Sequence, residues 1–305
     1  MTSKKVEVEF GYYPSALSID IGDIQVQTLP GIKEKVHAVT ASDGVDAEWL
    51  YPPAQMVHQI GGGIQQKPYA SRIFGLPKTH VIRHAKIDGD DHLAFLVWVL
   101  SFFLGIRLTT TEMGYLDATP IKPGRLVDFA ISHSNLPTVL ALADTFWTTN
   151  RVEPALAKRF AAAVHALFLS QNPHSLQFER FIYLYIAVDA CYSLASSLVP
   201  LSKRVTHANR IGWVCSLFGM TTPVWASPKP IHGAEVAMIR NATLHEALFM
   251  GEPLGFALHG IGSNQNLTLE MKALVCRLLV ALIGAPSAEY VRTPIDTRQR
   301  QGLNL

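Results

Sequence analysis

The chain has 305 residues, 49% of them hydrophobic and 16% charged, so a large buried core is expected and extensive disorder is not. Its formal net charge of +2 is too small to indicate nucleic-acid binding by itself. The charge is unevenly divided, because residues 1–130 carry 12 Lys and Arg against 14 Asp and Glu, whereas residues 131–305 carry 14 against 10. The C-terminal half is therefore better suited to a polyanion, although a solvated basic tail explains the same imbalance.

Neither export nor membrane insertion is indicated. The first ten residues include lysines but no apolar run that would make a secretory signal. The most apolar run, 93–106, is too short to span a bilayer and is predicted to be a core element. The three cysteines (Cys191, Cys215 and Cys276) lie far apart without metal-binding spacing, which indicates buried reduced thiols. We therefore expect a cytoplasmic protein with no membrane partner, no cofactor and no metal site.

The first 130 residues are predicted to form a β-rich or α+β region. Apolar and polar residues alternate around 6–10, 19–21 and 24–28, which is typical of strands, and glycines and prolines separate them. Residues 51–78, with several prolines and Gly61-Gly62-Gly63, are predicted to be mostly loop with a flexible turn. A helix over 92–104 follows the predicted capping turn Asp88–Asp91 and ends at Gly105. A strand is expected near 106–111, and 120–124 is expected to be a linker.

The pattern becomes helical after about residue 131, with prolines and Asn172-Pro173 separating the segments. Apolar side chains recur at three- and four-residue steps between 178 and 188, which predicts a helix facing the core. Helices are predicted near 136–148, 153–170, 175–199, 203–218, 232–250 and 266–284. The expected fold class is therefore α+β, with residues 1–130 as a β-rich domain and 131–305 as an all-α bundle.

Histidines and aspartates cluster after residue 80 in a way that suggests a metal. His80 and His84 are followed by Asp88–Asp91 and His92. Two histidines four apart on a helix bind zinc, but the β-branched residues between these two predict a strand, which separates them by about 13 Å. The aspartates lack the ligand spacing of a calcium loop. A helix-capping turn is favoured, and a metal enzyme centred on these residues is kept as an alternative.

The most distinctive candidate site is Arg240-Asn241-Ala-Thr-Leu-His245. Arginine offers a fixed fork of donors to phosphate, histidine transfers protons near neutral pH, and asparagine binds phosphate or holds the imidazole. Asn241 and His245 share one helix face, whereas Arg240 lies roughly 140° away from His245. Either the long arginine side chain wraps around the helix, or a second subunit completes the site. Ordinary capping or surface contacts are the plain alternative.

This motif resembles the Arg-Asn-x3-His form of the motif of HEPN domains (higher eukaryotes and prokaryotes nucleotide-binding), in their Apea-like branch. The surroundings are similar too, with an aromatic-rich helix over 177–190 and a helix containing Ile211-Gly-Trp213 before the motif. The resemblance covers roughly residues 135–290. His207 and His232 also lie in this half and suit the same cleft, although surface or capping roles are favoured for them.

The resemblance implies a four- or five-helix bundle that forms a homodimer and acts as a metal-independent endoribonuclease. It makes His245 the catalytic histidine, Arg240 the phosphate-binding arginine and Asn241 the polar residue that follows it. Attack by the RNA 2′-hydroxyl would leave a 2′,3′-cyclic phosphate and a 5′-hydroxyl. We expect a role in prokaryotic defence or a toxin system, with an antitoxin or defence partner, and a sensing role for residues 1–130. The alternative is a catalytically silent HEPN module that binds nucleic acid or a protein partner.

Overall fold

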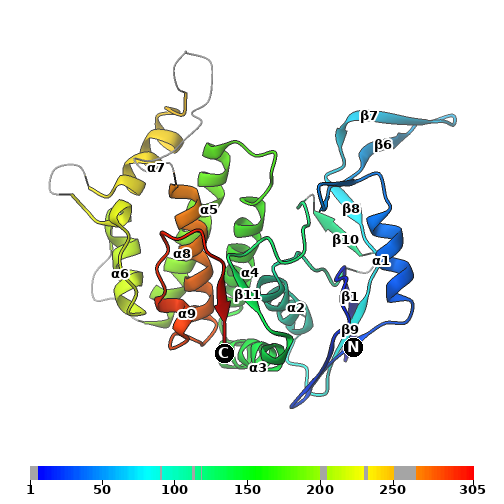
Figure 1. The fold of residues 1–305 in the computed structure, drawn as a ribbon, viewed down its shortest axis with the longest axis horizontal. Coiled ribbons are helices and arrows are strands. Elements are labelled where there is room, and N and C mark those ends of the chain that lie inside the picture. Colours follow the sequence, from blue (N-terminus) through cyan, green and yellow to red (C-terminus); the bar gives the residue numbers. More distant parts are fainter. Residues whose placement is uncertain are drawn as a thin grey trace. The chain divides into compact units, whose positions relative to one another are not determined.

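The computed structural model describes residues 6–89, 91–111, 114–117, 119–199, 205–229, 233–250 and 266–305 (Figure 1). Internal contacts divide the chain into two compact units: unit 1 is Met1–Leu126 with His133–Thr148, and unit 2 is Val127–Ser132 with Thr149–Leu305. The predicted α+β class is confirmed, because strands dominate the N-terminal region and helices dominate the remainder. The first helix of the expected bundle belongs by its contacts to unit 1.

Unit 1 is built on a four-stranded antiparallel sheet in the order β1-β9-β3-β2. Its strands are β1 (Glu7–Phe10), β2 (Ser18–Ile21), β3 (Ile24–Thr28) and β9 (His80–His84). Ile82 pairs with Val8 on one side and Val26 on the other, and Ile82 and Val26 are fully buried. The strand predicted from the β-branched residues of 80–84 is thus a central strand of the sheet.

Helix α2 (His92–Leu104) contacts β1 and β9 and has the bounds predicted from the sequence. Nearly all of its residues are buried, and its side chains are apolar on all sides, as expected for a helix enclosed by the core. Gly105, at φ 61°, ends it. Asp91 occupies the N-cap position, as the predicted capping turn requires, but its side chain makes no capping hydrogen bond.

Other parts of unit 1 differ from the predictions. Residues 32–40, for which no helix was predicted, form helix α1 (Ile32–Thr40), with Val36 and Val39 on its inner face. The expected loop 51–78 contains the antiparallel hairpin β6 (Ala54–His58) and β7 (Ile64–Ala70), whose three turn glycines all have positive φ. The expected strand at 106–111 is reduced to one bridge between Thr109 and Gly11. The remaining elements are β4 (Val45–Asp46), β5 (Trp49–Leu50), β8 (Ile73–Gly75), β10 (Tyr115–Asp117), η1 (His133–Asn135) and α3 (Leu136–Thr149).

Unit 2 is organised around α5 (Gln177–Leu198), which packs against α4 (Pro154–Leu169) and α8 (Leu267–Leu282) and also contacts the two helices that follow it. The other elements are η2 (His207–Asn209), α6 (Arg210–Leu217), η3 (Val224–Ala226), α7 (Glu235–His245) and α9 (Glu289–Arg292). A parallel pair, β11 (Phe129–Ile131) with β12 (Gln301–Leu303), adds strands to the expected all-α bundle. Pro154 begins α4 at a first-turn position, as predicted.

Among the described residues, α5 is the helix that is long and apolar enough to cross a membrane. Half of its most apolar window is buried inside the protein, against α4 and α8. This packing accounts for its apolar composition. The cysteines are buried as predicted, and burial raises the pKa of the Cys215 thiol to about 12.

Candidate active site

The Arg240–His245 motif occupies the last six residues of α7. The helix is shorter than predicted, because Ala247 adopts φ 55° just beyond its end and the Leu248 N–H bonds the carbonyl of Ala242. Phe249 then stacks on Phe178 of α5, with ring centroids 4.6 Å apart. The C-terminal end of α7 is therefore turned and held against α5.

The structure brings Arg240, Asn241 and His245 together within one chain. Arg240 Nη1 donates to Asn241 Oδ1 at 2.9 Å and also to His245 Nε2. The arginine side chain thus wraps around the helix, and no second subunit is required for this contact. Because a guanidinium only donates, Nε2 of His245 accepts and its neutral ring carries the proton on Nδ1. Asn241 and His245 are exposed, and Arg240 is half-buried.

A tyrosine of α5 connects this trio to a second histidine. The Arg240 Cζ lies 6.0 Å from the ring centroid of Tyr185, and the Tyr185 hydroxyl lies 3.1 Å from His207 Nδ1. Burial is the main cause that raises the pKa of Tyr185 to about 12. The charge of Asp189 also raises it, whereas Arg240 and Arg210 lower it. The phenol therefore stays neutral near physiological pH.

An aspartate and a second arginine complete the arrangement. Arg210 Nη1 donates to Asp189 Oδ1 at 2.8 Å, and Asp189 Oδ2 lies 3.9 Å from His207 Nδ1. The guanidinium of Arg210 also lies over the ring of Tyr192, 4.7 Å from its centroid. We call the full set the α7 cluster: Tyr185, Asp189, His207, Arg210, Arg240, Asn241 and His245.

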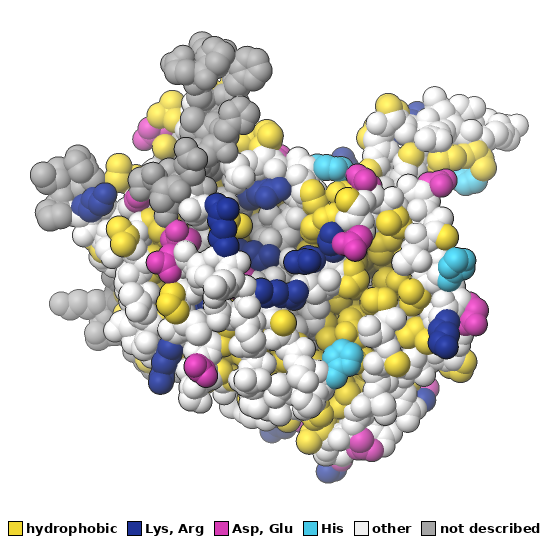
Figure 2. Space-filling model, in the orientation of Figure 1, with side chains coloured by type: hydrophobic (Ala, Val, Ile, Leu, Met, Phe, Trp, Pro, Cys, Tyr) yellow, Lys and Arg dark blue, Asp and Glu magenta, His cyan; other side chains and the backbone are white. Residues whose placement is uncertain are grey.

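The sequence identified only part of this cluster. Tyr185 was predicted to face the core, and its hydroxyl contributes the polar edge of a residue that is otherwise buried. Tyr185 and Asp189 are four residues apart on α5, so their shared face was a signal in the sequence. His207 does lie near the motif, whereas His232 is outside the described residues. Figure 2 shows several Lys and Arg side chains gathered on one face of the molecule.

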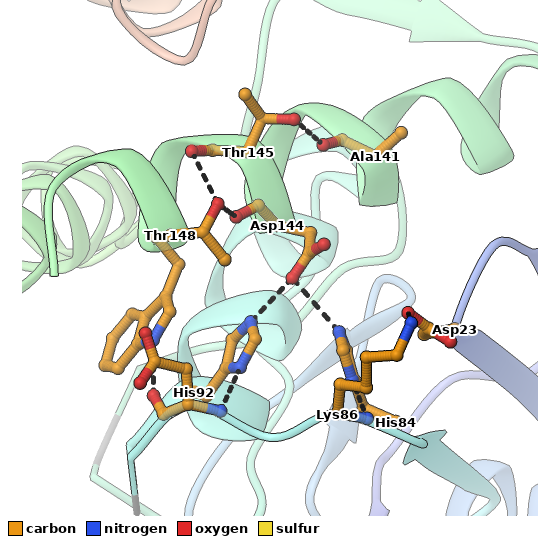
Figure 3. A network of polar contacts seen from close by, with 10 residues as sticks. Asp23, His84, Lys86, His92, Ala141, Asp144, Thr145 and Thr148 are labelled. Atoms are coloured by element: carbon orange, nitrogen blue, oxygen red, sulfur yellow. Dashed lines mark hydrogen bonds and ion pairs between the residues drawn. The ribbon is translucent and has the colours of Figure 1, made fainter.

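Unit 1 contains a different histidine cluster from the one expected. His84 Nε2 and His92 Nε2 lie 3.1 and 2.8 Å from the same oxygen of Asp144, a residue of α3 (Figure 3). Their candidate ligand atoms lie within 4.8 Å of one another. However, His84 Nδ1 accepts the Lys86 N–H and His92 Nδ1 accepts the Asp88 N–H. Each neutral ring must therefore carry its proton on Nε2, the atom that a metal would need, so the geometry fits hydrogen bonds to Asp144.

His80, the first residue of the alternative metal site, does not belong to this group. It lies in the core of unit 1, with Nδ1 2.8 Å from Thr79 Oγ1 and its ring stacked on Phe10. Burial lowers the pKa of His80 to about 4, so its ring is neutral near pH 7. Asp90 lies outside the described residues. The predicted set is thus not assembled by the fold, and Asp144 takes the place of its aspartates.

Comparison of the chain with protein-family models, with curated proteins and with solved structures found no match.

Proposed function

We propose that this chain is a metal-independent endoribonuclease of the HEPN type, with its active site in the α7 cluster. The observation that carries the proposal is the hydrogen bonding of Arg240 to both Asn241 and His245 at the exposed end of α7. A cation that only donates hydrogen bonds and an imidazole that accepts them lie side by side. These are the two groups that phosphodiester transesterification needs most.

The geometry supports separate roles for His245 and Arg240 in this reaction. His245 Nε2 takes the proton of the ribose 2′-hydroxyl as this oxygen attacks the adjacent phosphorus. Arg240 binds the non-bridging oxygens, where negative charge grows during the attack. The P–O5′ bond then breaks, giving a 2′,3′-cyclic phosphate and a 5′-hydroxyl.

The resting contact between Arg240 and His245 fits this scheme. While the guanidinium donates to Nε2, the imidazole lone pair is occupied and the base is held inactive. A phosphate is a stronger acceptor than a neutral imidazole, so it draws Arg240 away and frees Nε2. Substrate binding would thus activate the base.

The wider biology follows from the family resemblance. We propose a cytoplasmic homodimer formed through the helical bundle, serving in prokaryotic defence or a toxin system with an antitoxin or defence partner. Unit 1 would sense the trigger or select the substrate. The positive balance of residues 131–305 supports RNA as the ligand of unit 2.

The second candidate is a catalytically silent module that binds nucleic acid or protein through the same surface. The observation that favours it is again the Arg240–His245 hydrogen bond, because an arginine that stays on Nε2 leaves the base permanently occupied. Binding without cleavage would then be the whole function.

One assay separates these candidates. The parent protein, His245→Ala and Arg240→Ala are incubated with mixed RNA in the presence of EDTA. His174→Ala, which changes an exposed histidine of the α4–α5 turn, is the matched control. Cleavage by the parent and by His174→Ala, lost in the other two, supports the endoribonuclease. RNA binding without cleavage by a folded parent supports the silent module, and cleavage only with added metal would overturn both.

A further inference from the structure

The proposed reaction needs two proton transfers, and the Arg240–His245 motif supplies one of them. The attacking 2′-oxygen must lose a proton, and the departing 5′-oxygen must gain one. A single imidazole performs both tasks only in sequence, whereas two imidazoles act in the same step. The structure places a second imidazole, His207 of η2, in the α7 cluster.

Tyr185 links the two halves of the cluster. Its ring lies beneath the Arg240 guanidinium, 6.0 Å from Cζ to the ring centroid, and its hydroxyl is 3.1 Å from His207 Nδ1. The rings of Tyr185 and His207 are stacked at an interplanar angle of 25°. Arg240 thus contacts His245 directly and lies over the ring of Tyr185, whose hydroxyl contacts His207.

His207 has a carboxylate, a phenol and an arginine of the α7 cluster around it. Asp189 Oδ2 is 3.9 Å from Nδ1, which makes an ion pair when the imidazole carries a charge. Asp189 is itself oriented by Arg210 at 2.8 Å, and Tyr185 is neutral. Arg210 and Arg240 oppose the charge, but Arg210 is already paired with Asp189. His245 Nε2, by contrast, accepts a hydrogen bond from the Arg240 guanidinium.

We propose that His207 is the general acid of the reaction, paired with His245 as the general base. This inference rests on the proposed endoribonuclease. As the 2′-oxygen bonds to phosphorus, its proton passes to His245 Nε2. As the P–O5′ bond breaks, protonated His207 gives its proton to O5′. Atoms and charge balance without any co-reactant, and exchange with water restores both imidazoles.

The test uses a leaving group that needs no acid. Two substrates are compared: an ordinary RNA dinucleotide, and the same dinucleotide with sulfur in place of the bridging 5′-oxygen. A thiolate departs without being protonated. We expect His207→Ala to lower cleavage of the ordinary substrate by about 10²–10⁴-fold and to cleave the sulfur substrate at close to the parent rate. His245→Ala should be slow on both, and His174→Ala should match the parent on both.

His207→Gln guards against a folding defect, because its amide can bond Tyr185 but cannot transfer a proton. The activity of the parent on ordinary RNA should fall at high pH as His207 loses its proton. This decline should be absent with the sulfur substrate. Equal impairment of His207→Ala and His207→Gln on both substrates, or no impairment on either, would overturn the role of His207. A parent that cleaves neither substrate, or a His245→Ala variant with parent activity, would overturn the endoribonuclease and this inference with it.

Discussion

The Arg240 guanidinium donates hydrogen bonds to two neighbouring side chains, an amide and an imidazole. Its Nη1 donates to Asn241 Oδ1 and to His245 Nε2, and the planar guanidinium holds its donors in a fixed fork that matches phosphate oxygens. Lysine at this position would keep the charge but not the planar fork. We expect Arg240→Lys to retain much of the RNA affinity while lowering kcat by about 10²–10³-fold.

Steady-state cleavage kinetics and a filter-binding assay check this expectation. Arg151→Lys, which changes an exposed arginine after α3, is the matched control and should leave both quantities unchanged. Parent-like kcat in Arg240→Lys would show that only a point charge is needed.

A second arginine, Arg277, has a structural task. It is 1% exposed, and Nη1 donates to Asp128 Oδ2 at 2.7 Å while Nε and Nη2 donate to Thr293 and Pro294. The hydroxyl of Tyr290 donates to the other oxygen of Asp128. This network ties α8 to the segment that follows α9.

Removing the charge of Asp128 should leave a buried cation without its counter-ion. We expect Asp128→Asn to lower the free energy of unfolding by about 3–5 kcal/mol, as for other broken buried pairs. Urea unfolding followed by circular dichroism measures the change, with the exposed Asp296→Asn as the control. A loss below about 1 kcal/mol would mean that the backbone carbonyls alone satisfy Arg277.

At the scale of elements, Asp144 joins α3 to the end of β9 and the start of α2 (Figure 3). The hydrogen bond from His92 is the main cause that lowers the pKa of Asp144, His84 adds to it, and burial opposes it. A carboxyl whose pKa is depressed by folding stabilises the fold above its unfolded pKa. That stability is lost as pH falls through the folded pKa.

Asp144→Asn should therefore remove a pH-dependent part of the stability. We expect a loss of about 1–2 kcal/mol at pH 7 and a shallower decline of stability below pH ~4 than in the parent. Thermal unfolding between pH 7 and pH 3 measures both. Asp20→Asn, on the exposed side of β2, provides the control, and identical acid profiles for Asp144→Asn and the parent would contradict the expectation.

Periodicity predicted the buried elements and missed the exposed ones. The bounds of α2 followed from its apolar run, and Val81 and Ile82 identified β9. The hairpin β6–β7 was missed because most of its residues are exposed, so no alternation marks its strands. Helix α1 was missed because it is short and contains β-branched residues, although its inner positions have helical spacing.

The candidate site was predictable only where it is local. Arg240 and His245 lie on one helix, so the sequence displayed their relation. His207 contacts Tyr185, and Arg210 contacts Asp189 on the same helix. Only the packing of α6 and α7 against α5, with η2 against both, brings these residues to the motif. Asp144 similarly lies 52 residues from His92 and joins it through tertiary packing. The spacing of residues along the sequence does not show which distant residues the fold brings into contact.

At the scale of the whole molecule, the question is how an active site relates to the proposed homodimer. The 140° offset on an ideal helix left two routes, wrapping within one chain or completion by a partner. In the structure Arg240 reaches His245 of its own chain. Each protomer of a dimer would then hold a complete Arg240–His245 pair.

Mixing two inactive variants distinguishes these routes. Arg240→Ala and His245→Ala protomers are unfolded together, refolded at equal concentration and assayed on RNA, with heterodimer formation verified by mass spectrometry. If each site used Arg240 of one chain and His245 of the other, half of the dimers would carry one intact site. Activity would then return to about a quarter of the parent level.

Because the pair lies within one chain, we expect no recovery, whereas a heterodimer of parent and double variant should keep one working site. Recovery in the first mixture would show that the catalytic pair is shared between subunits and that the contact within one chain is only a resting arrangement.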